Sequence, residues 1–287
     1  MKSFLYLIIS VVIAITLTSA VQKTSESTKS ITLQASGSNV GSESLKQSAD
    51  IISARLKLFG LNSFEVKVSP EKGQVKVLLP DKTDLSEIEG LLTSKGEMSF
   101  YETCTHDEIT DLLKTDNQLF KLLNTKMVKN DSDPRVGCSV NENREKTDQY
   151  LRSSAPVKNC KFLWGFESKK SGYCLFALKT GSEGKPLMVR SDVESIKIVA
   201  GKDPQDHKIQ IKLKSAACGV FADATKKNLN RVIAIVIDDQ VYSWPVVRNV
   251  IEGGEIEVTG NFTANEVNCF PAIFNSDELP ISFKLLK

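Results

Sequence analysis

The stretch 232-VIAIVIDDQVYSWPVV-247 decides how the second half of the chain folds. Residues 233–237 are apolar at every position, which is typical of a central strand buried on both faces. The polar turn 238–240 follows, and a second apolar run returns. Pro245 in that run cannot donate a backbone hydrogen bond, so we expect it at a sheet edge or a bulge. The stretch therefore predicts a hairpin in the core.

The first half of the chain alternates strand and helix patterns. The predicted elements are a strand at 31–35, a helix over 44–59 that opens with a Ser44–Gln47 capping box, a hairpin over 64–79, a helix capped by Asp84 with Glu87, and a closing strand at 97–101. This β-α-β-β-α-β order is the split βαβ, ferredoxin-like arrangement, with both helices on one face of an antiparallel sheet. The fold class is α+β.

The region after residue 104 predicts a second mixed set of elements. These are a helix over 107–124, a loop over 127–140, a helix over 142–152, a strand pair at 160–166 and 172–179, a strand at 208–214, a helix over 216–229 and a last helix over 263–275 with a Thr263–Glu266 capping box. Pro271 lies inside the last helix, where it removes a donor and predicts a kink near Val267.

The N-terminus is typical of an exported protein. Lys2 precedes an apolar run over 4–20 that ends on Thr-Ser-Ala, so residues 1–20 read as a signal peptide, with an uncleaved anchor as the alternative. Residues 21–30 are rich in Ser, Thr and Lys and predict a tether. The rest of the chain is longer than one hydrophobic core usually supports, which favours two lobes.

Charge and cysteine content limit the partners and the covalent structure. The formal net charge is +2 with both signs interspersed, which gives no electrostatic case for a nucleic-acid partner. The six cysteines permit disulfides in an exported chain, but their spacing does not reveal the pairing. Cys174 and Cys218 have apolar or small neighbours and are expected to act as small core residues.

Two groups of polar residues contain side chains that could carry chemistry. Asp238 and Asp239 could pair as acid and base, but adjacent strand-end carboxylates point apart, and a turn explains them better. The segment CTHDE at 104–108 gathers possible zinc ligands, yet the other histidine, His207, lies in a polar turn far away in sequence. Nucleophile, phosphate and dinucleotide motifs do not occur. The sequence therefore predicts no enzyme, no cofactor and no metal.

Tyr242 and Trp244 are the candidate binding residues. They alternate along the returning strand, so both rings would lie on one side of it. If they face outward, they would grip apolar polypeptide. The alternative is that they pack beneath the helix over 263–275, as large aromatic side chains usually do.

Several segments in order carry a family resemblance: SADIISARLKLFGL, QVKVLLPD, GEMSFYET, FLWGF, LFALK, ATKKNLNRVIAIVIDDQVYSWPVV and VTGNFTANEV. From about residue 31 to 285 the chain resembles the first large periplasmic domain (P1) of the protein-export subunits SecD and SecDF. The resemblance implies a ferredoxin-like base over 31–103, an inserted α+β head over 104–277, and a final strand over 278–287 that returns to the base.

The resemblance also implies a function. A relative of this domain would hold unfolded, exported polypeptides in the periplasm during translocation, without catalysis. Unlike SecD, this sequence shows no further segment able to carry proton flow through a membrane. The leading hypothesis is a periplasmic polypeptide-binding module, either released after signal cleavage or tethered to the inner membrane by residues 4–20. The alternative is a structural or regulatory partner that docks on the Sec translocon or another envelope complex.

Overall fold

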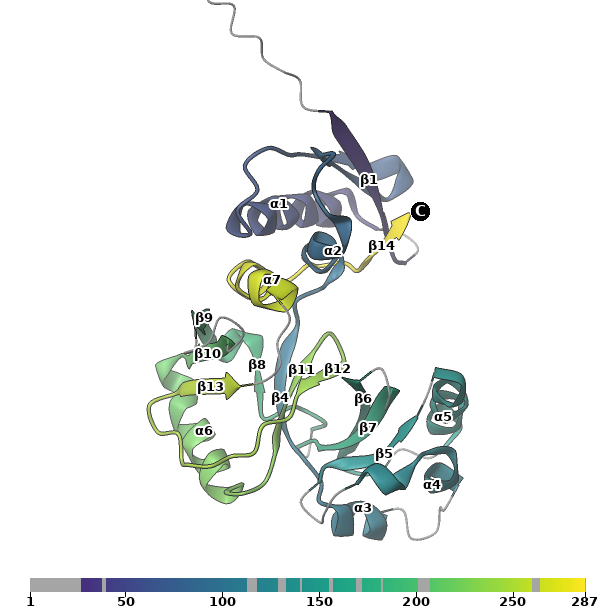
Figure 1. Ribbon diagram of the computed structural model, residues 1–287, viewed down its shortest axis with the longest axis vertical. Coiled ribbons are helices and arrows are strands. Elements are labelled where there is room, and N and C mark those ends of the chain that lie inside the picture. Colours follow the sequence, from purple (N-terminus) through teal and green to yellow (C-terminus); the bar gives the residue numbers. More distant parts are fainter. Residues whose placement is uncertain are drawn as a thin grey trace, which may run out of the picture.

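The computed structural model describes residues 27–37, 40–112, 118–128, 133–139, 141–154, 157–168, 172–181, 183–200, 207–259 and 264–286. The chain forms two lobes, one above the other in Figure 1. The predicted signal peptide and Thr263 of the predicted capping box lie outside the described residues. The first strand begins at Thr28, so the predicted tether over 21–30 is too long at its C-terminal end.

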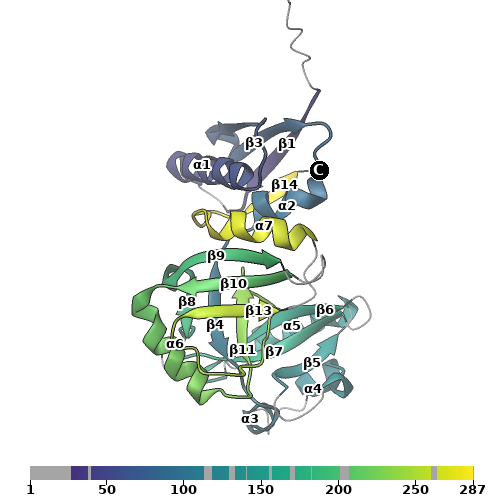
Figure 2. The same cartoon turned by 60° about the vertical axis from the view of Figure 1, so that its left-hand side comes forward.

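The upper lobe is an antiparallel sheet with the strand order β14-β1-β3-β2. Its strands are β1 (Thr28–Ala35), β2 (Glu65–Ser69), β3 (Gln74–Pro80) and β14 (Phe283–Leu286), with the short 3-10 helix η1 (Pro70–Lys72) between β2 and β3. Helices α1 (Ser42–Leu58) and α2 (Leu85–Thr93) lie on the same side of the sheet in both views (Figures 1 and 2). Their apolar faces and the alternate positions of β1 and β3 form one core.

The closing strand of this lobe differs from the prediction. The predicted strand forms as β4 (Met98–Glu102), but it pairs with β11 and β8 in the lower lobe. The place beside β1 is taken by β14 from the C-terminal end of the chain. Alternation of apolar residues identifies a strand and its buried face, but it does not identify the neighbouring strand.

The two predicted helix starts have different outcomes. Asp84 caps α2 as predicted, although its carboxylate accepts from the N–H of Ser86 and forms no box with Glu87. The Ser44–Gln47 capping box is wrong, because α1 begins at Ser42 and the N–H of Leu45 donates to the carbonyl of Gly41. The helix therefore starts with backbone contacts, and Ser44 lies inside its first turn.

The lower lobe contains two sheets, with orders β5-β7-β6-β12-β11-β4-β8 and β13-β10-β9. The remaining strands are β5 (Arg135–Ser139), β6 (Cys160–Ser168), β7 (Gly172–Lys179), β8 (Met188–Val189), β9 (Val193–Ala200), β10 (His207–Leu213), β11 (Ile233–Ile237), β12 (Gln240–Ser243) and β13 (Glu255–Thr259). The helices are α3 (His106–Leu112), α4 (Gln118–Leu122), α5 (Asn141–Ser153), α6 (Ser215–Lys227) and α7 (Ala264–Phe274), with short 3-10 helices η2 (Thr125–Met127) and η3 (Arg190–Asp192).

The hairpin from the opening stretch forms as predicted. β11 lies between β12 and β4 and is almost entirely buried. Asp238 and Asp239 have φ of +48° and +60°, so the turn uses two left-handed residues, which matches the twist of a two-residue hairpin. The register shifts between Ile235 and Val236, and Pro245 follows the end of β12. Pro245 therefore lies just beyond the regular ladder.

The region over 107–140 differs in part from the prediction. Within the predicted helix, the described residues form α3 and α4, and residues 113–117 between them lie outside the described residues. The predicted loop contains β5, whose residues are all buried. Polar and turn-forming residues around β5 concealed a strand that pairs with β7. The predicted helix over 142–152 and the strand pair that follows it are present as α5, β6 and β7.

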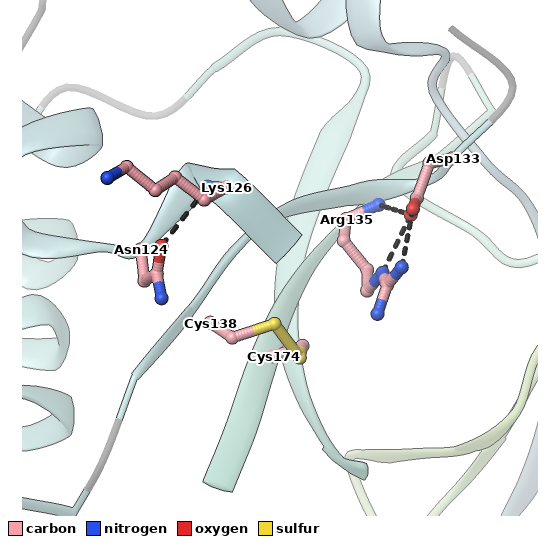
Figure 3. Close-up of a disulfide and its surroundings, with 6 residues drawn as sticks. All are labelled: Asn124, Lys126, Asp133, Arg135, Cys138 and Cys174. Carbon is pink, nitrogen blue, oxygen red and sulfur yellow. Dashed lines mark hydrogen bonds and ion pairs between the residues drawn. A yellow bond between two sulfur atoms is a disulfide. The ribbon is translucent and has the colours of Figure 1, made fainter. Parts of the chain in front are cut away.

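A disulfide joins β5 to β7 (Figure 3). Cys138 and Cys174 lie opposite each other in the antiparallel register. Beside them, the buried Arg135 and Asp133 form an ion pair with an Nη2 to Oδ2 distance of 2.5 Å. Cys174 is therefore a disulfide half rather than the core thiol we expected, and Cys218 is a half-buried free thiol.

Helix α7 lies between the two lobes, with α1 and α2 on one side and β9 on the other (Figure 2). Cys269, Phe270, Ile273 and Phe274 of α7 belong to the same apolar core as the upper lobe. Pro271 is inside this helix as predicted. The kink near Val267 stays a prediction.

Replacing both Cys138 and Cys174 with alanine should lower the free energy of unfolding by about 2–4 kcal/mol, because the open chain then gains entropy in the unfolded state. Urea denaturation measures this loss. The matched control is Cys218→Ala, a free and half-buried thiol, which should change stability by less than about 1 kcal/mol. Equal losses in the two variants would contradict the role given to the disulfide.

Candidate functional site

The chain passes between the lobes twice, and the two passages lie side by side. The first passage, residues 94–97, connects α2 to β4, and the second, residues 275–282, connects α7 to β14. The N–H of Leu279 donates to the carbonyl of Lys95 at 2.9 Å. Any movement of one lobe relative to the other acts on these two segments.

Arg55 of α1 binds both passages. Its side chain is fully buried, which is rare for arginine unless its donors are satisfied. The donors reach Leu91 O at 3.3 Å, Ser94 O at 2.5 Å and Lys95 O at 3.1 Å, and also Ser276 Oγ at 3.0 Å and Asp277 O at 3.1 Å. One guanidinium from the upper lobe therefore holds the two passages together.

Arg190, in η3 of the lower lobe, binds the same passages from the other side. Its Nη1 donates to the carbonyl of Gly96 at 2.8 Å, and its Nη2 donates to the carbonyls of Phe274 and Ser276. Neither arginine was predicted from the sequence as a residue of the site. A signal existed for Arg55, because it lies three residues after Ile52, on the apolar stripe of α1.

Asp238 completes this junction. Its Oδ1 accepts from the backbone N–H groups of Gly96 and Glu97, both at 2.9 Å, and its Oδ2 accepts from Ser94 Oγ at 2.5 Å. Asp239 instead points to Lys161, with a 2.7 Å ion pair at the surface. The acidic pair is thus a hairpin turn, as predicted, and one of its carboxylates also anchors the first passage.

The two arginines are close enough to influence each other. Burial and the neighbouring Arg190 lower the pKa of Arg55 to about 10. Burial also lowers the pKa of Arg190, against the opposing effects of Glu278, Asp277 and Asp238. Both side chains remain charged at neutral pH, because the pKa of a free guanidinium lies far above 7.

A cleft of about 990 Å³ opens beside this junction, between α1 of the upper lobe and the start of β9 in the lower lobe. Leu58 at its rim is 55% exposed, which is high for a large apolar side chain. The lining residues are Gln47, Asp50, Ile51, Ala54, Leu58, Met98, Arg190, Ser191, Val193, Glu194, Ile196, Lys214 and residues 274–278. The cleft is therefore lined by apolar and by charged side chains alike.

A second cavity, of about 640 Å³, lies within the lower lobe. Phe100 of β4, Phe221 of α6 and Ile235 of β11 line it, together with the segment 245–251 that follows β12. It does not reach the upper lobe through any of its lining residues. The cleft between the lobes is therefore the candidate functional site.

Tyr242 and Trp244 do not share one exposed face. The Tyr242 ring lies 4.8 Å from that of Phe270 in α7, and the Trp244 ring lies 4.8 Å from that of Phe176 in β7. They pack against different clusters of buried residues, because β12 ends at Ser243 and strict alternation ends with it. Both are half-buried, and contact of either ring with polypeptide stays a prediction.

The CTHDE segment leads into helix α3, which begins at His106. Thr105 and Glu108 make a reciprocal capping box at the start of α3, with the Thr105 N–H donating to Glu108 Oε2 at 2.8 Å. Burial opposes ionisation of Glu108, but Lys179 and the Thr105 N–H outweigh it and lower the pKa of Glu108. His207 belongs to β10. Within the described ranges, no three possible metal ligands gather.

The fold and the cleft define the class: a two-lobed α+β domain whose lobes are joined by two short passages and a shared helix. Residues 178–281 match the family model described as "SecDF, P1 head subdomain". Residues 178–281 are therefore similar to the P1 head subdomain of SecDF, which agrees with the resemblance predicted from the sequence.

Curated proteins of the same family are similar to parts of this chain. Over 79 residues the chain is 38% identical to the protein translocase subunit SecD of Calditerrivibrio nitroreducens. The matched stretch covers 28% of this chain and 15% of that protein. Over 110 residues it is 28% identical to SecDF of Thermus thermophilus, covering 38% of this chain and 15% of that protein. The matched stretches thus span a small part of these relatives.

The structural likeness extends over most of the chain. A structure described as "Structure and function of a membrane component SecDF that enhances protein export" has a TM-score of 0.51 and 18% identity, covering 90% of this chain and 98% of that one. "Crystal structure of SecDF in Super-membrane-facing form" has a TM-score of 0.53, covering 90% of this chain and 29% of that one. In the described part of this chain, no helix is long and apolar enough to cross a membrane.

Arg55→Ala should lower the free energy of unfolding by about 3 kcal/mol, because the buried carbonyls of both passages lose their donor. Thermal and urea unfolding measure the loss. Arg152→Ala is the matched control, since Arg152 is an exposed arginine on α5 and should change stability by less than about 0.5 kcal/mol. A similar small change in both variants would show that the junction does not depend on Arg55.

Proposed function

We propose that this chain is a non-catalytic module of protein export that contacts translocating polypeptides in the periplasm. The observation that carries the proposal is the cleft between the lobes, with its exposed apolar rim at Leu58. An unfolded polypeptide offers apolar side chains and unpaired backbone groups, and such a cleft can bind both. The relationship to SecD and SecDF, which are named protein translocase subunits, supports this role.

The composition of the cleft favours binding over catalysis. Among its lining residues in the described part of the chain there is no histidine or cysteine to act as a general base or nucleophile. Arg190, a strong anion-binding group, is already bonded to three backbone carbonyls. Arg190 therefore has a structural role at the cleft, and the apolar side chains of the lining remain for contact with the ligand.

The architecture of the proposed module is a ferredoxin-like base with an inserted head. The sheet order β14-β1-β3-β2 and two helices on one face support a split βαβ base whose fourth strand is β14. The head then runs from β4 to α7, and the boundaries lie at the two passages, 94–97 and 275–282. We propose these limits in place of the sequence-based boundaries at 103 and 277.

The N-terminal segment supports an exported location. Its apolar run over 4–20 after Lys2 fits a signal peptide or an anchor in the inner membrane. An exported location would also suit the Cys138–Cys174 disulfide, since disulfides persist in oxidising compartments.

Leu58→Ser should weaken capture of an unfolded exported polypeptide by about threefold to tenfold, because the variant loses apolar surface at the rim of the cleft. Val220→Ser on α6 is the matched control, since Val220 is 53% exposed, against 55% for Leu58, and does not line the cleft. Fluorescence anisotropy with a labelled, reduced and unfolded substrate measures the binding.

Photo-crosslinking from position 58 should give a product with the same substrate, and crosslinking from position 220 should not. If neither the wild-type protein nor the crosslinking variant engages unfolded substrate at stoichiometric excess, the proposed function is wrong. Co-purification with translocon subunits under those conditions would then favour docking on the export machinery without substrate contact.

A further inference from the structure

The outer edge of strand β9 is the feature that carries a further inference. β9 is the last strand of the sheet β13-β10-β9, and within the described residues no strand pairs with its outer side, although α7 packs against β9. The side chain of Asn275 occupies this edge at Ile196. The Ile196 N–H donates to Asn275 Oδ1 at 3.1 Å, and Asn275 Nδ2 donates to the Ile196 carbonyl at 2.9 Å.

These two hydrogen bonds match the pair that a residue of a neighbouring strand would form with Ile196. In an antiparallel ladder, a residue of one strand exchanges both an N–H and a C=O bond with the residue opposite. The carboxamide of Asn275 supplies one acceptor and one donor in the same way. It therefore acts as a stand-in for one residue of an added strand.

Asn275 lies at a position from which its side chain can be displaced. It follows the last residue of α7, at the start of the second passage, and its side chain is exposed while Ile196 is 1% exposed. Asn275, Val193, Glu194 and Ile196 all line the cleft, so a ligand in the cleft lies next to this edge. Antiparallel alternation directs the backbone groups of Ile198 to the same side as those of Ile196.

The charged side chains that line the cleft indicate which charge a ligand should carry. Four acidic side chains line it, Asp50, Glu194, Asp277 and Glu278, against two basic ones, Arg190 and Lys214. Arg190 is already engaged by backbone carbonyls, and Glu194 also pairs with Lys212 at the surface. The remaining carboxylates favour a ligand that carries lysine or arginine beside its apolar residues.

We propose that the outer edge of β9 binds an extended polypeptide segment with apolar and basic residues by strand addition, and that this segment displaces the side chain of Asn275. The inference rests on the proposed function and makes it more specific, because it names the backbone of β9 as the recognition element. Strand addition reads main-chain groups, so it accepts many sequences, as an export factor requires.

The test uses the full chain and a fluorescent peptide of alternating valine and lysine. A second peptide of the same sequence carries N-methyl groups at alternate backbone nitrogens, which removes the donors that a strand needs. Asn275→Ala should bind the first peptide about tenfold more tightly than wild type, because two bonds no longer compete with the ligand. The N-methylated peptide should bind at least about tenfold more weakly to both proteins.

Two further variants serve as controls. Asn62→Ala removes an exposed asparagine in the upper lobe, after α1, and should leave the affinity unchanged. Asn275→Asp keeps the acceptor for the Ile196 N–H, loses the donor and adds a carboxylate to the cleft, so it should bind the valine–lysine peptide more tightly than wild type. Should Asn275→Ala fail to fold, the comparison of the two peptides on the wild-type protein still decides the proposal.

The outcomes distinguish failure of strand addition at β9 from failure of the proposed function. Equal binding of the plain and N-methylated peptides would overturn strand addition and leave the proposed function standing, with side-chain contacts in the cleft as its basis. Unchanged or weaker binding by a folded Asn275→Ala would overturn the displacement of Asn275. Failure of every protein to bind either peptide or an unfolded substrate would overturn the inference and the proposed function together.

Discussion

The buried guanidinium of Arg55 is the interaction on which the arrangement of the two lobes depends. It sits in the apolar face of α1 and donates to both passages of the chain between the lobes. Taking a cation out of water is costly, and only a full set of acceptors offsets that cost. The two passages supply those acceptors only when they lie together, so the geometry of the junction and the burial of Arg55 require each other.

The sequence predicted the local elements well and their pairing less well. The hairpin of β11 and β12, the cap at Asp84 and the hairpin of β2 and β3 follow from nearby residues, and all are present. The partner of β4 does not follow from nearby residues, because β11 is far away along the chain. β5 was missed for a related reason: its burial arises from β7 and a disulfide, while its own residues look like a loop.

The candidate site was largely invisible in the sequence, because backbone atoms build most of it. Arg55 and Arg190 bind carbonyls, and Asp238 binds backbone N–H groups, so their partners carry no distinctive side chains. The aromatic pair was predicted from residue type and from alternation along the returning strand. Its two rings pack on Phe270 and Phe176, where the end of β12 sends them to different parts of the core. The lower lobe is inserted between two segments of the upper lobe, and the cleft lies where the lobes meet. The residues that come together there are therefore set by the topology of the whole chain.

The position of β14 has a consequence for how the protein is made. β1 is synthesised well before its edge partner β14, because the other strands and all the helices lie between them in the sequence. Until those residues arrive, one side of the upper sheet has exposed backbone groups and a gap in its apolar core where Phe283 belongs. Completion of the upper sheet therefore waits for synthesis of β14, and a product truncated before β14 would expose an unpaired, aggregation-prone strand edge.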